Sequence, residues 1–304
     1  MKPLLPLTGS ITVACAAVAA CRDTAGPPPL PLPPHALAFV SDRYLGQRDI
    51  YLMGTDGTIT NLTSTSLAYD GWPAWSPDGS KIAFESDRTA DPRSINLNIY
   101  VMNADGSGVV RLTADTTNEF EPNWSPDGSK IVFGSDRDSL PGGRRVFHIF
   151  VMNTDGTGVA RLTNTAGDDA QPAWSPDGTR IAFATNRDGN DEIYTMMADG
   201  ATPVNLTKSG FSDEGPAWSP DGTKIAFYSN RDGGFAIYVM NADGSGVVKL
   251  TQSVVPDELP SWSPDGRYIA FDSDADLYFT NADGSNQQAL TRGDVTEIMP
   301  RWRP

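Results

Sequence analysis

The chain has 304 residues, a length that suits one large all-β domain as well as two domains of average size. Its 38 acidic residues outnumber its 23 lysines and arginines, and the net charge of −15 would repel a phosphate backbone, so we expect no nucleic-acid partner. The only cysteines are Cys15 and Cys21, which excludes disulfide frameworks, thiolate zinc sites and cysteine nucleophiles from the rest of the chain.

The N-terminus resembles a bacterial lipoprotein signal. An Ala-rich apolar stretch covers residues 11–20 and stops at Cys21. Small residues before a cysteine suit a signal peptidase, and the thiol takes the lipid. The apolar stretch is too short to span a bilayer. We therefore expect residues 1–20 to be a signal peptide and Cys21 to be lipidated, with secretion without a lipid as the alternative.

Residues 21–34 are predicted to form a tether. The stretch from residue 26 to residue 34 contains six prolines, and such a density favours an extended polyproline conformation of about 3.1 Å per residue. A tether of this kind would hold a folded domain away from a membrane. We expect the chain to contact the membrane through its lipid anchor only.

From residue 35 to residue 304 the chain repeats one unit. Each copy contains Pro-x-Trp, then Ser-Pro-Asp-Gly, an apolar triplet ending in Phe, a stretch like Ser-Asp-Arg, an aromatic segment, Asn-Ala-Asp-Gly or a variant, and Leu-Thr. The two glycine-containing motifs are typical of tight turns. Each copy therefore predicts four short strands, which we name A (Pro-x-Trp), B (ending in Phe), C (aromatic) and D (Leu-Thr). The repeat tryptophans are Trp75, Trp124, Trp174, Trp218, Trp262 and Trp302, at spacings of 49, 50, 44, 44 and 40 residues.

A period of 40 to 50 residues with four strands per copy is typical of a β-propeller blade. The repeat region begins with a strand B at residues 36–40 and ends with a strand A at residues 300–302, so the last strand completes the first blade. This closure removes two open sheet edges. We predict an all-β fold over residues 35–304, a six-bladed β-propeller of four-stranded antiparallel blades, and expect a monomer.

The motifs Trp-Ser-Pro-Asp-Gly, Ile-Ala-Phe, Ser-Asp-Arg and Ile-Tyr-Val-Met-Asn-Ala-Asp-Gly resemble the repeat of TolB-type propellers, a WD-like family. The resemblance covers 270 of the 304 residues. It implies the fold strongly and the function weakly, because one fold serves many functions. The family's namesake carries a further α/β domain ahead of its propeller, which 34 residues cannot supply, so we expect a stand-alone relative.

An acidic residue stands five positions before each repeat tryptophan, where strand A begins near the mouth of the central channel. Two interpretations are open for these carboxylates. They would bind a hard cation such as Ca²⁺ or a cationic partner group, or each would pair with the arginine of a neighbouring Ser-Asp-Arg stretch, which we favour. The acids are Asp70, Glu119, Asp169, Asp213, Asp257 and Glu297, and the arginines are Arg43, Arg88, Arg137, Arg187 and Arg231, with Ala275 where a sixth arginine is expected.

The D-to-A connections and the B-to-C loops are expected on one face, which we call the top face. Variable loops on a rigid scaffold are the usual place for binding. The longest loops follow the second and third Ser-Asp-Arg stretches and carry Arg93, Arg144 and Arg145, which would anchor an acidic partner or simply be solvated. Trp72 lies outside the tryptophan series, and it would stack on a sugar or peptide side chain or fill a local gap.

Familiar catalytic motifs such as Gly-x-Ser-x-Gly and His-Glu-x-x-His are absent, and His35 and His148 form no cluster. The acidic alternation of residues 272–276 predicts a shortened B-to-C hairpin. We expect no catalytic residue and no cofactor, and a scaffold in the bacterial envelope, periplasmic or on the outer membrane, that binds a protein partner. The alternatives are a metal-dependent hydrolase or lyase with a cation such as Ca²⁺ in the central channel, and a glycan-binding propeller.

Overall fold

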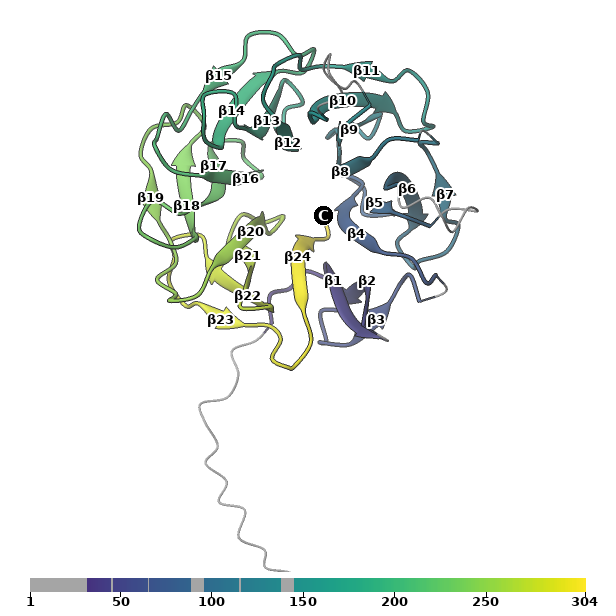
Figure 1. Cartoon of the computed structure of the whole chain (residues 1–304). Helices are drawn as coiled ribbons and strands as arrows, with labels where there is room; N and C mark the ends of the chain where they lie inside the picture. Colours follow the sequence, from purple (N-terminus) through teal and green to yellow (C-terminus); the bar gives the residue numbers. More distant parts are fainter. Residues whose placement is uncertain (1–31, 45, 65, 89–95, 115, 138–144) are drawn as a thin grey trace, which may run out of the picture. The chain divides into compact units, whose positions relative to one another are not determined.

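The computed structural model describes residues 32–44, 46–64, 66–88, 96–114, 116–137 and 145–304. Within these ranges the chain forms six four-stranded antiparallel sheets around a central axis, which confirms the predicted six-bladed propeller (Figure 1). In the described part of the chain there is no helix with the length and hydrophobicity that a membrane crossing needs. Cys21, the predicted signal peptide and most of the predicted tether lie outside the described residues.

Each blade runs from an inner strand A to an outer strand D. Blade one contains β24 (Glu297–Trp302), β1 (Leu37–Tyr44), β2 (Gln47–Met53) and β3 (Ile59–Asn61), and blade two contains β4 (Asp70–Trp75), β5 (Lys81–Ser86), β6 (Asn98–Asn103) and β7 (Val110–Arg111). Blade three contains β8 (Glu119–Trp124), β9 (Lys130–Ser135), β10 (His148–Asn153) and β11 (Ala160–Arg161), and blade four contains β12 (Asp169–Trp174), β13 (Arg180–Thr185), β14 (Glu192–Met197) and β15 (Val204–Asn205). Blade five contains β16 (Asp213–Trp218), β17 (Lys224–Ser229), β18 (Ala236–Asn241) and β19 (Val248–Lys249), and blade six contains β20 (Asp257–Trp262), β21 (Tyr268–Ser273), β22 (Asp276–Asn281) and β23 (Gln288–Ala289).

The C-terminal strand closes the ring, as the order of motifs predicts. β24 pairs antiparallel with β1, with Trp302 opposite Leu37 and Glu297 opposite Ser41. The Arg303 backbone N–H donates to the Ala36 carbonyl at 2.8 Å, which continues the pairing beyond the strands. The two ends of the repeat region therefore share one sheet, and no inner or second strand of blade one is left unpaired.

The turn between strands A and B shows why Ser-Pro-Asp-Gly recurs. In blade two the Ser76 hydroxyl and the Ser80 backbone N–H both donate to one carboxylate oxygen of Asp78, at 2.6 and 3.0 Å. Gly79 has a φ of +64°, a conformation that a side chain disfavours. The Asp78 carboxylate thus accepts hydrogen bonds from both sides of its own turn, which stabilises a short loop.

The core lies between neighbouring blades. Each strand B is buried on both faces, and its phenylalanine is fully buried in all six blades. Repeat tryptophans join neighbouring blades, since the Trp124 indole N–H donates to the Ala74 carbonyl at 3.1 Å and that of Trp302 to the Ser261 carbonyl at 3.1 Å. Apolar burial and these hydrogen bonds together hold the blades in one rigid ring.

Candidate functional site

The six repeat acids are the first residues of the six inner strands, and all six are buried, with 0 to 2% of their surface exposed. The backbone N–H groups of five of them donate to carbonyls of the preceding blade, and none of the six lines the cavity on the axis that is described below. Among the described residues no group of three or more His, Cys, Asp or Glu side chains is placed to hold a metal ion. Among these described residues the carboxylates therefore form no cluster that could hold one metal ion.

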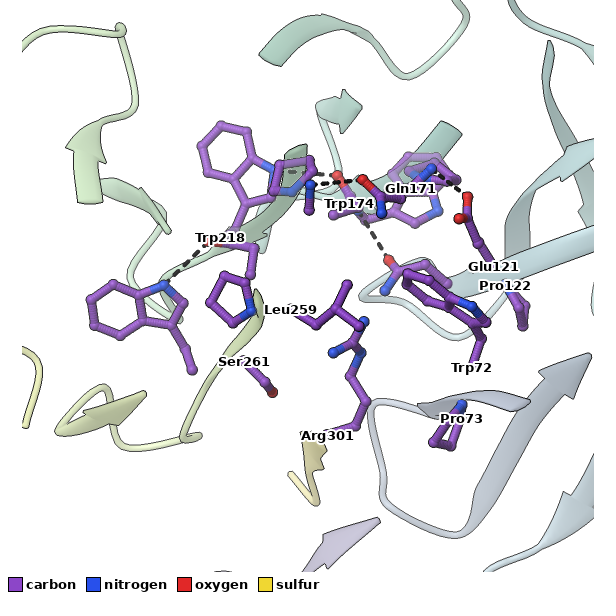
Figure 2. A pocket seen from close by; sticks show the side chains of 18 of the residues that line it. Trp72, Pro73, Glu121, Pro122, Gln171, Trp174, Trp218, Leu259, Ser261 and Arg301 are labelled. Carbon is purple, nitrogen blue, oxygen red and sulfur yellow. Dashed lines mark hydrogen bonds between the residues drawn. The ribbon is translucent and has the colours of Figure 1, made fainter. Parts of the chain in front are cut away.

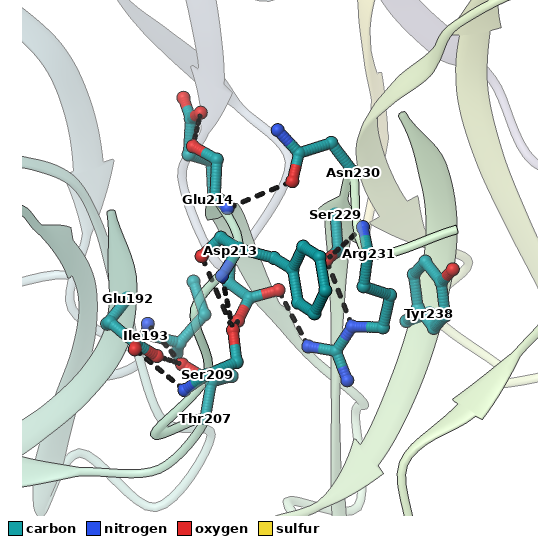
Figure 3. A network of polar contacts seen from close by, with 12 residues as sticks. Glu192, Ile193, Thr207, Ser209, Asp213, Glu214, Ser229, Asn230, Arg231 and Tyr238 are labelled. Carbon is teal, nitrogen blue, oxygen red and sulfur yellow. Dashed lines mark hydrogen bonds and ion pairs between the residues drawn. The ribbon is translucent and has the colours of Figure 1, made fainter. Parts of the chain in front are cut away.

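Five of the six acids form ion pairs with the arginine of their own blade, which is the arrangement that the packing interpretation predicts. The N–O distances are 2.6 Å for Arg88 and Asp70, 3.1 Å for Arg137 and Glu119, 2.7 Å for Arg187 and Asp169, and 2.7 Å for Arg231 and Asp213, and Arg43 pairs with Glu297. Figure 3 shows the pair in blade five, where the Ser209 hydroxyl also donates to Asp213 at 2.7 Å. Each guanidinium lies over aromatic rings of strands B and C, so charge pairing and packing coincide.

Blade six lacks the arginine, as the motif predicts, and its B-to-C connection is shortened. β21 and β22 are joined by only two residues, Asp274 and Ala275, both with positive φ, which confirms the predicted shortened hairpin. The Ala275 carbonyl accepts the Glu297 backbone N–H at 2.7 Å, as the Phe235 carbonyl accepts that of Asp257 at 3.1 Å. Counted from Ser273, Ala275 is at the predicted arginine position, and counted back from the start of β22 it takes the place of Phe235. The loop that would carry the arginine is missing.

A cavity of about 220 Å³ lies on the axis and is lined by the inner strands (Figure 2). The third residue of every inner strand has a positive φ and forms a β-bulge; these residues are Trp72, Glu121, Gln171, Gly215, Leu259 and Met299. Such a conformation costs a residue other than glycine about 1 to 2 kcal/mol. Five residues other than glycine adopt this unfavourable conformation, so we infer that the bulges have a structural role. The hydrogen bonds around them show what that role is.

The bulges turn backbone N–H groups toward the preceding blade. The N–H of Glu121 donates to Glu85 at 2.9 Å, that of Gly215 to Gln171 at 2.7 Å, and that of Met299 to Asp272 at 3.4 Å. The N–H of Gln171 likewise donates to the Glu121 carboxylate. Side chains of one blade thus hold the bulge of the next at four of the six junctions around the cavity.

Burial raises the pKa values of the carboxyl groups that hold the bulges. It raises the pKa of Glu85 to about 8 and that of Asp272 to about 7, against the lowering effect of the backbone N–H groups they accept. Burial also raises the pKa of Glu121 to about 7 and lowers the pKa of Arg301 to about 10. Figure 2 shows Arg301 reaching from β24 toward Leu259 across the cavity.

We expect the free energy of unfolding to fall as the pH rises from 5 to 8. The native state keeps protons on Glu85 and Asp272 that the unfolded chain has already lost near pH 4, so this stabilisation is full in acid and disappears as the pH passes the raised pKa values. The decrease should be on the order of 2 to 4 kcal/mol. Urea unfolding of the native chain and of the double variant Glu85→Gln and Asp272→Asn at pH 5, 6.5 and 8 measures it. An equal decrease in the variant would contradict this assignment.

The other predicted site residues have these positions. Trp72 lines the cavity and packs against the core, and the Arg301 guanidinium lies 5.6 Å from its ring centre. Arg145 is on the surface, 60% exposed, and pairs with the buried Asp136 at 2.8 Å. Arg93 and Arg144 lie outside the described residues. His148 is buried, with a ring nitrogen 3.5 Å from Asp169.

Four residues of this network were not predicted from the sequence: Glu121 and Arg301, which line the cavity, and Glu85 and Asp272, which hold the bulges. Glu85 and Asp272 occupy one position of strand B, between the buried Phe and the Ser, and the other copies carry Val40, Gly134, Ala184 and Tyr228 there. A carboxylate at a strand position that is apolar in other copies is the signal that would have found these two.

The top face carries exposed apolar side chains. Three lie on D-to-A connections, where Leu67 is 79% exposed, Phe211 47% and Val254 102%, and Tyr44 at the end of β1 is 52% exposed. These apolar side chains are on surface connections between blades and do not pack into the core. This face is the best candidate for a macromolecular interface.

Comparisons with known proteins agree with this architecture. The profile of the TolB beta propeller domain matches residues 142–214 and 211–304, together more than half of the chain. A curated relative, a protein TolB homolog from Chlorobium luteolum, is 42% identical over 53 residues, a match that spans 17% of this chain and 12% of that relative.

Solved structures extend the likeness to the whole propeller. TolB from Acinetobacter baumannii is 25% identical with a TM-score of 0.74, over 89% of this chain and 67% of that one. A putative TolB from Agrobacterium tumefaciens is 22% identical with a TM-score of 0.68, over 89% of this chain and 99% of that one, which shows the fold. With the six closed blades and the repeated motifs, these matches show that the chain belongs to the TolB beta-propeller domain family.

Proposed function

We propose that this chain is a binding scaffold of the bacterial envelope that holds a protein partner on its top face and performs no chemistry of its own. The supporting observation is the apolar surface of the D-to-A connections, where Leu67, Phe211 and Val254 are exposed. Large apolar side chains on surface loops gain free energy when a partner buries them.

The envelope location is supported by two features. Residues 1–21 have the pattern of a lipoprotein signal, with Cys21 as the residue to be lipidated. The TolB beta-propeller family supplies the second, since proteins named TolB are among its relatives. In this proposal residues 21–34 tether the propeller to the lipid.

The site geometry favours a scaffold over the alternatives. A cation held by the repeat acids would compete with five arginines, because those acids are already ion-paired and buried. A glycan stacked on Trp72 would compete with the Arg301 guanidinium, which lies over the same ring. Within the described ranges, the exposed top-face side chains have no such competitor.

A photoreactive residue at position 211 or 254 should cross-link to one envelope protein when the full chain is expressed in its host. Val110 and Val248 are matched controls, since each is 57% exposed but lies on an outer strand, β7 or β19. We expect no cross-link from these two positions. Identification of the cross-linked species by mass spectrometry measures the result.

The double variant Phe211→Ser and Val254→Ser should reduce cross-linking from position 67 at least tenfold while leaving the melting temperature within about 1 °C, because exposed substitutions change stability little. Equal cross-links from the outer strands, or none from the top face, would contradict the proposed interface.

A further inference from the structure

Five blades hold an arginine in the same cradle. The Nε–H donates to the hydroxyl at the end of strand B at 3.0 to 3.3 Å, and a terminal nitrogen binds the first carboxylate of strand A. The guanidinium carbon lies 4.7 to 5.7 Å from the centres of two aromatic rings, one from strand B and one from strand C. In five blades, therefore, the group bound in this cradle is an arginine guanidinium.

Blade six keeps the cradle without the arginine. Asp257 stands opposite Ser273, as Asp213 stands opposite Ser229 in blade five. The rings of Phe271 and Tyr278 are stacked with centres 5.9 Å apart. Among the described residues no arginine or lysine lies over either ring, because the two-residue hairpin leaves no room for the loop that carries the arginine elsewhere.

The Asp257 carboxylate is 0% exposed, and within the described chain neither of its oxygens has a hydrogen-bond partner of normal geometry. The hydroxyls of Ser273, Thr251 and Ser253 lie nearby and lower its pKa, but burial is the larger effect and raises it. The nearby ammonium of Lys249 is paired with Asp232 at 3.4 Å. A buried carboxylate in this state is costly unless a cation or donor reaches it.

The ring pair of blade six is also open to its surroundings. The equivalent aromatic residues of strand C in the other blades are only 2 to 7% exposed, whereas Tyr278 is half-buried. Asp274 and Ala275 beside it are exposed. The ring surface that an arginine covers in the other blades is therefore partly exposed in blade six, and the Asp257 carboxylate is buried beneath it.

We propose that the blade-six cradle, formed by Asp257, Ser273, Phe271 and Tyr278, binds a guanidinium group supplied from outside the chain. A planar guanidinium stacks on aromatic rings while it donates hydrogen bonds to a carboxylate, which a compact ammonium group does less well. The source is the arginine side chain of a partner or a small guanidinium compound, and the two are distinguished below.

Thermal unfolding of the full chain tests the site. Guanidinium chloride at 20 mM should raise the melting temperature by about 1 to 3 °C relative to equal concentrations of sodium chloride or urea. The increase should vanish in Asp257→Asn. It should also vanish when Asp274 and Ala275 are replaced by the sequence of residues 230–235, which supplies an arginine from within. Arg231→Ala is the positive control, since it creates a second cradle of this kind in blade five. No increase in the native chain would overturn the proposal.

Titration calorimetry with the peptides Gly-Arg-Gly and Gly-Lys-Gly distinguishes the sources. Tighter binding of the arginine peptide by at least tenfold, lost in Asp257→Asn, would identify a partner's arginine side chain as the ligand. Stabilisation by guanidinium without binding of the arginine peptide would identify a small guanidinium compound. Equal binding of the two peptides would overturn the assignment of a guanidinium site.

Discussion

Removing residues 300–304 should unfold the propeller or lower its melting temperature by more than about 10 °C. The deletion removes half of β24, including Trp302, whose buried ring donates to the Ser261 carbonyl. It also removes the Arg301 carbonyl that accepts the Trp75 indole N–H. Loss of a buried tryptophan alone costs about 3 to 5 kcal/mol. Since whole domains are stable by only about 5 to 15 kcal/mol, opening the ring uses most of that stability.

A circular permutant that joins Pro304 to Ala36 and begins at Asp294 is the control. β24 and β1 are antiparallel neighbours with Trp302 opposite Leu37, so a short turn can connect them and the ring stays closed. We expect the permutant to keep a melting temperature near that of the native chain, measured by circular dichroism. A deletion variant as stable as the native chain would contradict the role of β24 as the closing strand.

The repeat pattern predicts what the blades share. The turn motifs, the Phe and Trp series and the position of the last strand A determine four strands per blade, six blades and the closure. The acid-and-arginine pairs were also predicted, because one residue of each type recurs at a fixed place. Asp213 and Arg231 meet in space for the same reason that Asp70 and Arg88 do.

The features that differ between blades could not be predicted in this way. Glu85 and Asp272 occupy a strand position that holds apolar or aromatic residues in other copies, so no repeat signal marks them. Their role depends on the bulge in the next blade, a conformation that Trp72 and Leu259 also adopt despite its cost. The deletion in the blade-six loop also could not be read from the repeat, and it brings Ala275, which the motif places at the arginine position, to the position of Phe235.

Arg231→Ala should lower the free energy of unfolding by about 3 to 5 kcal/mol, because it leaves the buried Asp213 carboxylate without its counter-charge. The Ser209 hydroxyl still donates to that carboxylate, but a neutral donor compensates only part of the loss. The rings of Phe227 and Tyr238 also lose the cation that covers them. Urea unfolding at pH 7 measures the change, and a loss below about 1 kcal/mol would contradict it.

Asp257→Asn should act in the opposite direction and leave stability unchanged or raise it by about 1 kcal/mol at pH 7. The blade-six carboxylate has no arginine, and burial raises its pKa, so a neutral amide removes a charge that the fold does not compensate. The hydroxyls of Ser253 and Ser273 are close enough to partner the amide. Asp213→Asn is the matched control and should destabilise, because the partly buried Arg231 then loses its anion. The same substitution would thus destabilise blade five but not blade six, and the presence of the arginine accounts for the difference.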